Sequence, residues 1–93
     1  MRFFWKEENN DLLKQYRNIS FEQIILSIEN MQIVDVLEHP NQEKYIGQIY
    51  ILVEINNYVH VVPAYISNSE QECHLQTIYP SRKYTEKYLR SQE

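Results

Sequence analysis

The stretch Gln48 to Ile66, QIYILVEINNYVHVVPAYI, decides the fold because it predicts a hairpin of two apolar strands. Asn56-Asn57 separates the strands, and asparagine tolerates the positive φ angles that a two-residue turn requires. Pro63 has no N–H to donate, so we expect it at a bulge or on an exposed edge. A two-residue turn predicts these opposed pairs: Ile55 with Tyr58, Val53 with His60, and Ile51 with Val62.

Before the hairpin, the pattern of apolar residues changes to that of a helix. Ser20 and Gln23 have the S-x-x-Q spacing of a capping box, and Ile19 and Ile24 hold the flanking positions of a hydrophobic staple. The apolar residues that follow recur at i, i+3, i+4 and i+7, which is typical of a helix that faces a core. We therefore predict a helix from Phe21 to Glu29.

The remaining N-terminal half predicts strand, helix, strand and loop. The apolar start, Met1 to Trp5, favours a short strand, and the acidic pair after it favours a helix from about Glu7. Asn18 is a suitable left-handed residue to end that helix. Residues Gln32 to Glu38 predict a strand, and His39 to Gly47 predict the loop after it.

The C-terminal stretch Cys73 to Arg90, CHLQTIYPSRKYTEKYLR, predicts a strand to Tyr79 and then a helix to about Leu89. Ser81 supplies a hydroxyl that can cap this helix. The order of elements predicts one α+β domain over residues 1–93: an antiparallel β-sheet meander with two N-terminal helices and a C-terminal helix, the helices lying on one face.

Composition sets limits on the class of protein. The chain has 93 residues, 43% of them hydrophobic, and no apolar run near the roughly 20 residues that span a bilayer. Its start lacks the apolar centre and cleavage site of a signal peptide, so we expect a cytoplasmic protein that does not interact with membranes. Cys73 is the single cysteine, and the three histidines have no ligand spacing, so we expect neither a disulfide nor a metal or other cofactor.

The net charge of −4 argues against a general nucleic-acid binder. Positive charge nevertheless collects near the C-terminus, where the segment from Pro80 to Glu93 has four cations and two anions. Two of these cations, Arg82 and Lys83, open the predicted helix, where acidic residues would be more favourable. Two readings remain open: the cations and the free helix amides bind an anion such as phosphate, or the cations are solvated surface residues.

Motifs along nearly the whole chain resemble the BrnT family of bacterial toxins. The final segment from Ile78 to Tyr88, I-x-P-S-R-K-x-T-x-x-Y, is the most specific of them. The chain departs from the family in its acidic charge, in Tyr16-Arg17 where a Lys-His pair is common, and in Pro80 before Ser-Arg. The other motifs are F-x-W (Phe3, Trp5), R-N-I-S-F-E (Arg17 to Glu22), Asp35, and the loop residues His39, Glu43, Lys44 and Tyr45.

The resemblance implies a RelE-like fold and metal-free RNA cleavage, with neutralisation by a co-encoded antitoxin that usually carries a ribbon-helix-helix DNA-binding part. Such cleavage needs a base for the 2′-hydroxyl, an acid for the leaving oxygen and cations for the phosphorane. Arg82 also matches the arginine of the family's final motif. The candidate catalytic residues are Arg82, His39 and Glu43, and the candidate substrate-binding residues are Lys83, Arg17 and Tyr84.

Each candidate also has a plainer reading as turn surface, packing residue or solvated charge. His60, on an apolar strand face, is better explained as a hydrogen-bonded core histidine, so we do not place it in the site. A competing function is a non-catalytic partner-binding module with the same fold, which the acidic net charge favours. A third is an enzyme that acts on a small phosphorylated ligand at the same anion site.

Overall fold

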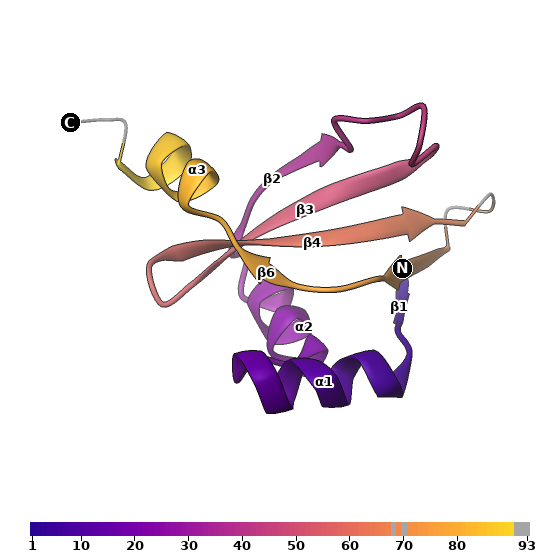
Figure 1. Ribbon diagram of the computed structural model, residues 1–93, viewed down its shortest axis with the longest axis horizontal. Coiled ribbons are helices and arrows are strands. Elements are labelled where there is room, and N and C mark those ends of the chain that lie inside the picture. Colours follow the sequence, from indigo (N-terminus) through magenta and orange to yellow (C-terminus); the bar gives the residue numbers. More distant parts are fainter. Residues whose placement is uncertain (68, 70, 91–93) are drawn as a thin grey trace.

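The computed structural model describes residues 1–67, 69 and 71–90 as an α+β fold in which helices cover a mixed sheet (Figure 1). Over these residues, six strands join in one sheet with the order β1-β5-β4-β3-β2, and β6 also pairs with β4. The elements are β1 (Arg2–Phe4), α1 (Glu7–Arg17), α2 (Phe21–Glu29), β2 (Ile33–Glu38), β3 (Gln48–Ile55), β4 (Tyr58–Ile66), β5 (Glu72–Leu75), β6 (Tyr79–Pro80), α3 (Arg82–Thr85) and the π-helical turn η1 (Glu86–Arg90).

The β3–β4 hairpin has the predicted turn and register. Asn56 and Asn57 have φ angles of 54° and 62°, as a two-residue turn with left-handed residues requires. All three predicted pairs, from Ile55 with Tyr58 to Ile51 with Val62, lie opposite one another. The local turn chemistry therefore sets the register of the central pair of strands.

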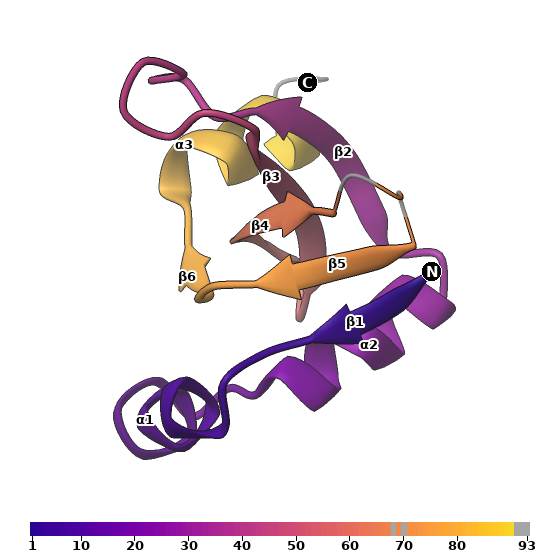
Figure 2. The ribbon, with the colours of Figure 1, turned by 90° about the vertical axis from the view of Figure 1, so that its right-hand side faces the viewer.

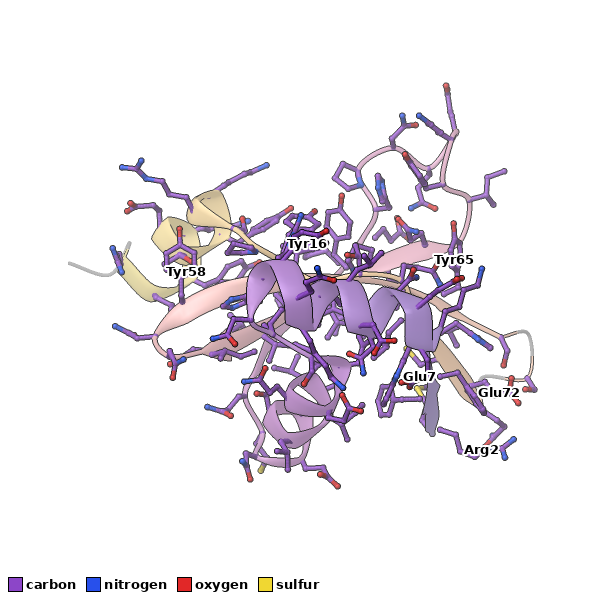
Figure 3. The ribbon with its side chains drawn as sticks, turned by 60° about the horizontal axis from the view of Figure 1, so that its bottom comes forward. Arg2, Glu7, Tyr16, Tyr58, Tyr65 and Glu72 are labelled. Atoms are coloured by element: carbon purple, nitrogen blue, oxygen red, sulfur yellow. The ribbon has the colours of Figure 1, made fainter. Side chains whose placement is uncertain are left out.

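The first strand corrects the prediction of a purely antiparallel meander. β1 pairs with β5 in parallel, with Phe3 opposite Cys73, and the other pairings are antiparallel. The chain leaves β1 through α1 and α2, which lie below the sheet in Figure 2, and re-enters the sheet at β2 on the opposite edge. β1 therefore cannot form a hairpin with β2, and it pairs with β5 instead. Figure 3 shows Arg2 and Glu72 facing one another across this pair, where they form an ion pair of 3.1 Å.

Pro63 lies neither at an edge nor at a bulge, contrary to expectation. It is buried in β4 and pairs with Tyr50 of β3. On its other side, β5 pairs with β4 from Ala64 onward and β6 pairs only up to Val61. The Pro63 carbonyl accepts the Gln76 N–H in this gap (2.9 Å), and the nitrogen of an extended residue points to the same side as its carbonyl. The N–H that Pro63 lacks would therefore lie in the gap where the partner of β4 changes from β6 to β5.

Two separate apolar cores lie on the two faces of the sheet, which corrects the expectation that all helices share one face. On the α1/α2 face, Phe21 and Ile24 are fully buried against the odd-numbered residues of β3, such as Val53. On the opposite α3 face, Tyr84 packs on Leu52. The strands of the hairpin are apolar at consecutive positions, so apolar side chains lie on both faces of the sheet and must be buried under other elements on each. Figure 2 shows the two covers on opposite sides of the sheet.

The helix ends follow the predicted capping chemistry. Ser20 and Gln23 form a complete capping box at the start of α2, and Asn18 ends α1 in the left-handed conformation with φ 52°. The C-terminal helix starts at Arg82 after the Ser81 cap, as predicted, but its regular part ends at Thr85. A π-helical turn then continues to Arg90.

A buried amide joins the two N-terminal helices. Asn10 of α1 is fully buried, and its Oδ1 accepts the Phe21 N–H at the start of α2 (2.8 Å). Its Nδ2 donates to Glu22 Oε1 (2.8 Å), and this bond is the main cause of the lowered pKa of Glu22. Asn10 therefore satisfies one backbone donor and one carboxylate at once, in a position where water cannot replace it.

We predict that Asn10→Asp destabilises the fold by about 1–3 kcal/mol at neutral pH. The new carboxylate keeps the acceptor for the Phe21 N–H but faces the Glu22 carboxylate, where Asn10 donated. Urea unfolding at pH 7 measures the loss, and acidification into the range where carboxylates protonate should reduce it. The matched control is Gln15→Glu, the same amide-to-acid change on the exposed side of α1. Equal stability of the two variants would contradict the role of Asn10.

Candidate functional site

The polar groups of the Ser81-to-Thr85 segment are first of all structural. Ser81 Oγ accepts the Tyr84 N–H (3.1 Å), which caps α3. The buried hydroxyl of Thr85 accepts the Val59 N–H (2.8 Å) and donates to the Ser81 carbonyl (2.7 Å). Since Ser81 N–H also donates to the Val59 carbonyl (2.9 Å), these bonds attach α3 to the start of β4.

The two cations between those residues point outward. The side chain of Arg82 is 88% exposed, and its Nε lies 4.0 Å from Glu86 Oε1, a distant ion pair. Lys83 Nζ lies 5.3 Å from the centre of the Tyr84 ring. Because α3 has only four residues, its dipole adds little to an anion site, and the cations themselves remain the feature that can contact phosphate.

His39 is held in one orientation by the loop after β2. Its ring stacks on Tyr45 with centroids 4.3 Å apart, and Nδ1 accepts the Asn41 N–H (3.0 Å). A nitrogen that accepts carries no proton, so the proton of the neutral ring is on Nε2. Nε2 lies 3.2 Å from Tyr50 Oη and donates to it. The Tyr50 hydroxyl thus keeps its own proton for another acceptor.

Aromatic side chains continue from His39 across the α3 face of the sheet. Tyr50 and Tyr79 meet edge to face at 6.5 Å, and Tyr84 and Tyr88 lie 6.3 Å apart on the terminal helix. Burial and a hydrogen bond to Tyr50 raise the pKa of Tyr79 above its ordinary range. In Figures 1 and 2 the loop before β3 and α3 stand on the same side of the sheet, at its two ends. We call this set the aromatic row: Tyr45, His39, Tyr50, Tyr79, Tyr84 and Tyr88.

Lysines accompany the rings at both ends of the row. Lys44 Nζ lies 5.4 Å from the centre of the Tyr45 ring, and Lys87 Nζ lies 5.3 Å from that of Tyr88, in the same relation as Lys83 to Tyr84. Cations over ring faces are attracted by the ring quadrupole and stay near it. On a chain with a net charge of −4, the row therefore carries its own positive charge.

The far end of the row is fastened to β2. The Tyr88 hydroxyl donates to Asp35 Oδ2 (2.5 Å), which joins η1 to the edge strand. This bond, the Val36 N–H and the charge of Lys87 lower the pKa of Asp35 below its ordinary 3.8. The same bond raises the pKa of Tyr88. The ionised carboxylate therefore holds the terminal turn in place.

We predict that acidification releases this contact. A lowered folded-state pKa stabilises the structure above the ordinary Asp value of 3.8, and that stabilisation is lost as the pH falls through the folded value. NMR should show the Tyr88 ring signals shift and amide exchange of Lys87 to Arg90 quicken in that range. Asp35→Asn should remove the transition, and Asp11→Asn, on the exposed side of α1, should keep it. Identical acid transitions in wild type and Asp35→Asn would contradict the contact.

The structure brings together only part of the predicted site. Tyr84 belongs to the aromatic row with His39, and Lys83 lies beside it. Glu43 is exposed in the His39 loop, and within the described part of the chain no hydrogen bond or ion pair joins it to His39 or to Arg82. Arg17 is on the α1/α2 face, where its Nη1 donates to the Ile78 carbonyl (2.8 Å).

Two central members of the row, Tyr50 and Tyr79, were not among the sequence candidates. Both are partly buried, and the strand pattern alone assigns such residues to packing. A sequence signal existed in the tyrosine content, because eight tyrosines in 93 residues exceed what one small core needs. Their partners lie on different strands, so only the sheet order shows that they meet.

Two other findings concern the described residues as a whole. No three side chains of the His, Cys, Asp or Glu type gather closely enough among them to hold a metal ion. None of the helices in that part of the chain has the length and apolarity to cross a membrane.

Comparisons with known proteins provide no relative to guide the assignment. No family model, no curated protein and no solved structure matches this chain.

Proposed function

We propose that this protein is a metal-independent endoribonuclease of the toxin type, and that RNA binds along the aromatic row. The observation that carries the proposal is the row itself, a line of rings that are partly exposed except for the buried Tyr84, with lysines at its ends. Bases stack on such rings whatever their sequence, and cations hold the phosphates between them. The motif resemblance to BrnT toxins supports the same function.

The geometry of the row suggests how the chemistry is divided. Tyr50, which accepts from His39 Nε2, directs its own proton away from that bond and serves as the acid for the leaving 5′-oxygen. Among the described residues, the Glu86 carboxylate at 4.0 Å is the only ion-pair partner of Arg82, so its guanidinium can bind the phosphate oxygens. Glu43, exposed in the loop of His39, is the proposed base for the 2′-hydroxyl.

We predict that Tyr50→Phe slows RNA cleavage by at least about a hundredfold, the usual contribution of one acid–base group, and that His39→Gln also slows it because Tyr50 loses the ring that orients its hydroxyl. The assay is cleavage of a short RNA by the purified protein at low salt, with circular dichroism to confirm folding. Tyr16→Phe, at a 73% exposed tyrosine of α1, is the matched control and should keep full activity.

Expression in bacteria gives an independent readout of the same proposal. The wild type should arrest growth, and Arg82→Ala should relieve the arrest. A wild-type protein that neither arrests growth nor cleaves RNA would remove the catalytic proposal. Full activity of Tyr50→Phe would remove the assigned acid.

The proposal includes a cytoplasmic location and a co-encoded antitoxin with a DNA-binding part, of the ribbon-helix-helix type that is usual in the BrnT family. One surface supports binding of a protein partner. β2 is an edge of the sheet among the described strands, and apolar side chains stand exposed along it and beside it. They are Leu26 (59% exposed), Met31 (90%), Ile33 (41%) and Val36 (50%).

The same surface favours the second candidate function, a partner-binding module without catalysis. An unpaired strand edge with apolar neighbours is a suitable site for an added strand. A pure binding module predicts a tight complex and no toxicity. Toxicity that a single polar substitution in the aromatic row abolishes would decide against it.

A further inference from the structure

A pocket opens on the α1/α2 side of β6 and shares Tyr79 with the aromatic row. Its volume is about 480 Å³, and it lies between the end of α1, the start of β4 and β6. An adjoining hollow of about 280 Å³ shares three of its residues and extends it to Tyr58. Figure 3 shows Tyr58 at the end of the hairpin that is close to α3. The pocket is lined by Arg17, Ile19, His60, Ile78, Tyr79 and Pro80.

His60 lines this pocket and has one ring nitrogen without a hydrogen-bond partner in the described part of the chain. Its Nδ1 lies 3.2 Å from the Tyr58 carbonyl, and since a carbonyl only accepts, Nδ1 carries the proton. Nε2 of the neutral ring is then an acceptor, and it forms no hydrogen bond within the described part of the chain. No buried side-chain nitrogen or oxygen there lacks a partner, so Nε2 must be accessible. Burial lowers the pKa of His60, which favours the neutral ring.

Arg17 supplies a donor to the same pocket. Its Nη1 donates to the Ile78 carbonyl (2.8 Å), which orients the guanidinium without using its other N–H groups. The other residues that line the pocket are the apolar Ile19, Ile78 and Pro80 and the ring of Tyr79. The pocket thus combines one donor, one acceptor and flat or apolar sides.

That combination selects a class of ligand. A phosphate brings negative charge to the lone pair of His60 Nε2, and the phosphodiester of RNA has no proton to donate to that nitrogen. A nucleobase, in contrast, has an N–H beside a carbonyl or ring nitrogen on its edge, and its faces suit apolar and aromatic walls. Both polar groups of the pocket are satisfied by such an edge.

We propose that this pocket binds a single nucleobase, whose edge N–H donates to His60 Nε2 while the adjacent acceptor receives an N–H of Arg17. Tyr79 belongs to the aromatic row and also lines the pocket, so a strand of RNA on the row can place one base in it. The inference rests on the proposed function only for the source of the base. Binding of a free nucleoside tests the pocket itself.

The test is a titration of the protein with uridine, cytidine, guanosine and adenosine, and separately with inorganic phosphate, observed by NMR at the methyl groups of Ile19 and Ile78. At least one nucleoside should shift these signals, and phosphate should not. His60→Phe and Arg17→Gln should each weaken nucleoside binding about fivefold. Because Gln is shorter than Arg and its amide is not placed to reach the Ile78 carbonyl, circular dichroism must confirm that both variants fold. The matched control is His74→Phe on β5, outside the pocket.

The pH provides a second readout that does not depend on a variant. The titratable and charged groups that line the pocket and its extension beside His60 are Arg17 from α1, Tyr58 from β4 and Tyr79 from β6. Burial holds the pKa of His60 below its ordinary 6.5, so its ring gains a proton as the pH falls from 7.5 toward 5 and then no longer accepts a hydrogen bond at Nε2. Nucleoside affinity should fall as the pH falls, whereas a phosphate site would gain affinity.

Three results would each contradict nucleobase binding in the pocket. The first is methyl shifts with phosphate that exceed those with every nucleoside, and the second is no shift with any nucleoside up to its solubility limit. The third is unchanged nucleoside binding in both variants. An active ribonuclease that fails this titration would lose the pocket and keep the proposed function. Nucleoside binding by a protein without ribonuclease activity would support the pocket proposal and remove the proposed function.

Discussion

The rest of the structure depends on the register of the β3–β4 hairpin, which the Asn56-Asn57 turn sets. Both strands are apolar on both faces, so a shift of one residue would exchange every side chain between the two cores. In the observed register Tyr50 lies on the α3 face and His60 lies opposite Val53 on the α1/α2 side. The turn therefore decides which chemical groups each face presents, although neither asparagine is part of the aromatic row.

The features that the sequence predicts well are local ones. The hairpin turn, the capping box of Ser20 and Gln23 and the left-handed Asn18 all depend on residues within a few positions of one another. The same holds for the cap at Ser81, which starts the terminal helix where the sequence predicts it. Each of these depends on backbone hydrogen bonds that a neighbouring side chain completes.

The features that the sequence does not predict depend on distant pairings. The parallel β1–β5 pair and the position of α3 on its own face follow from which edge each strand occupies, and Pro63 is tolerated inside the sheet because β5 gives way to β6 beside it. The candidate site has the same origin, since His39 meets Tyr50 only through the β2–β3 pairing. The sequence names His39, Lys83 and Tyr84 as candidates, but Tyr50 and the pocket around His60 follow from sheet order.

The two candidate binding regions lie on different faces and meet at Tyr79, the residue where the aromatic row reaches the pocket. The most direct test is NMR titration with a short RNA whose 2′-hydroxyls are methylated, so that it binds without being cut. RNA binding on the row predicts that the signals of His39, Tyr50, Tyr79 and Tyr88 shift first and by the largest amounts. Shifts confined to α2 and the exposed edge of β2, or none at low salt, would contradict it.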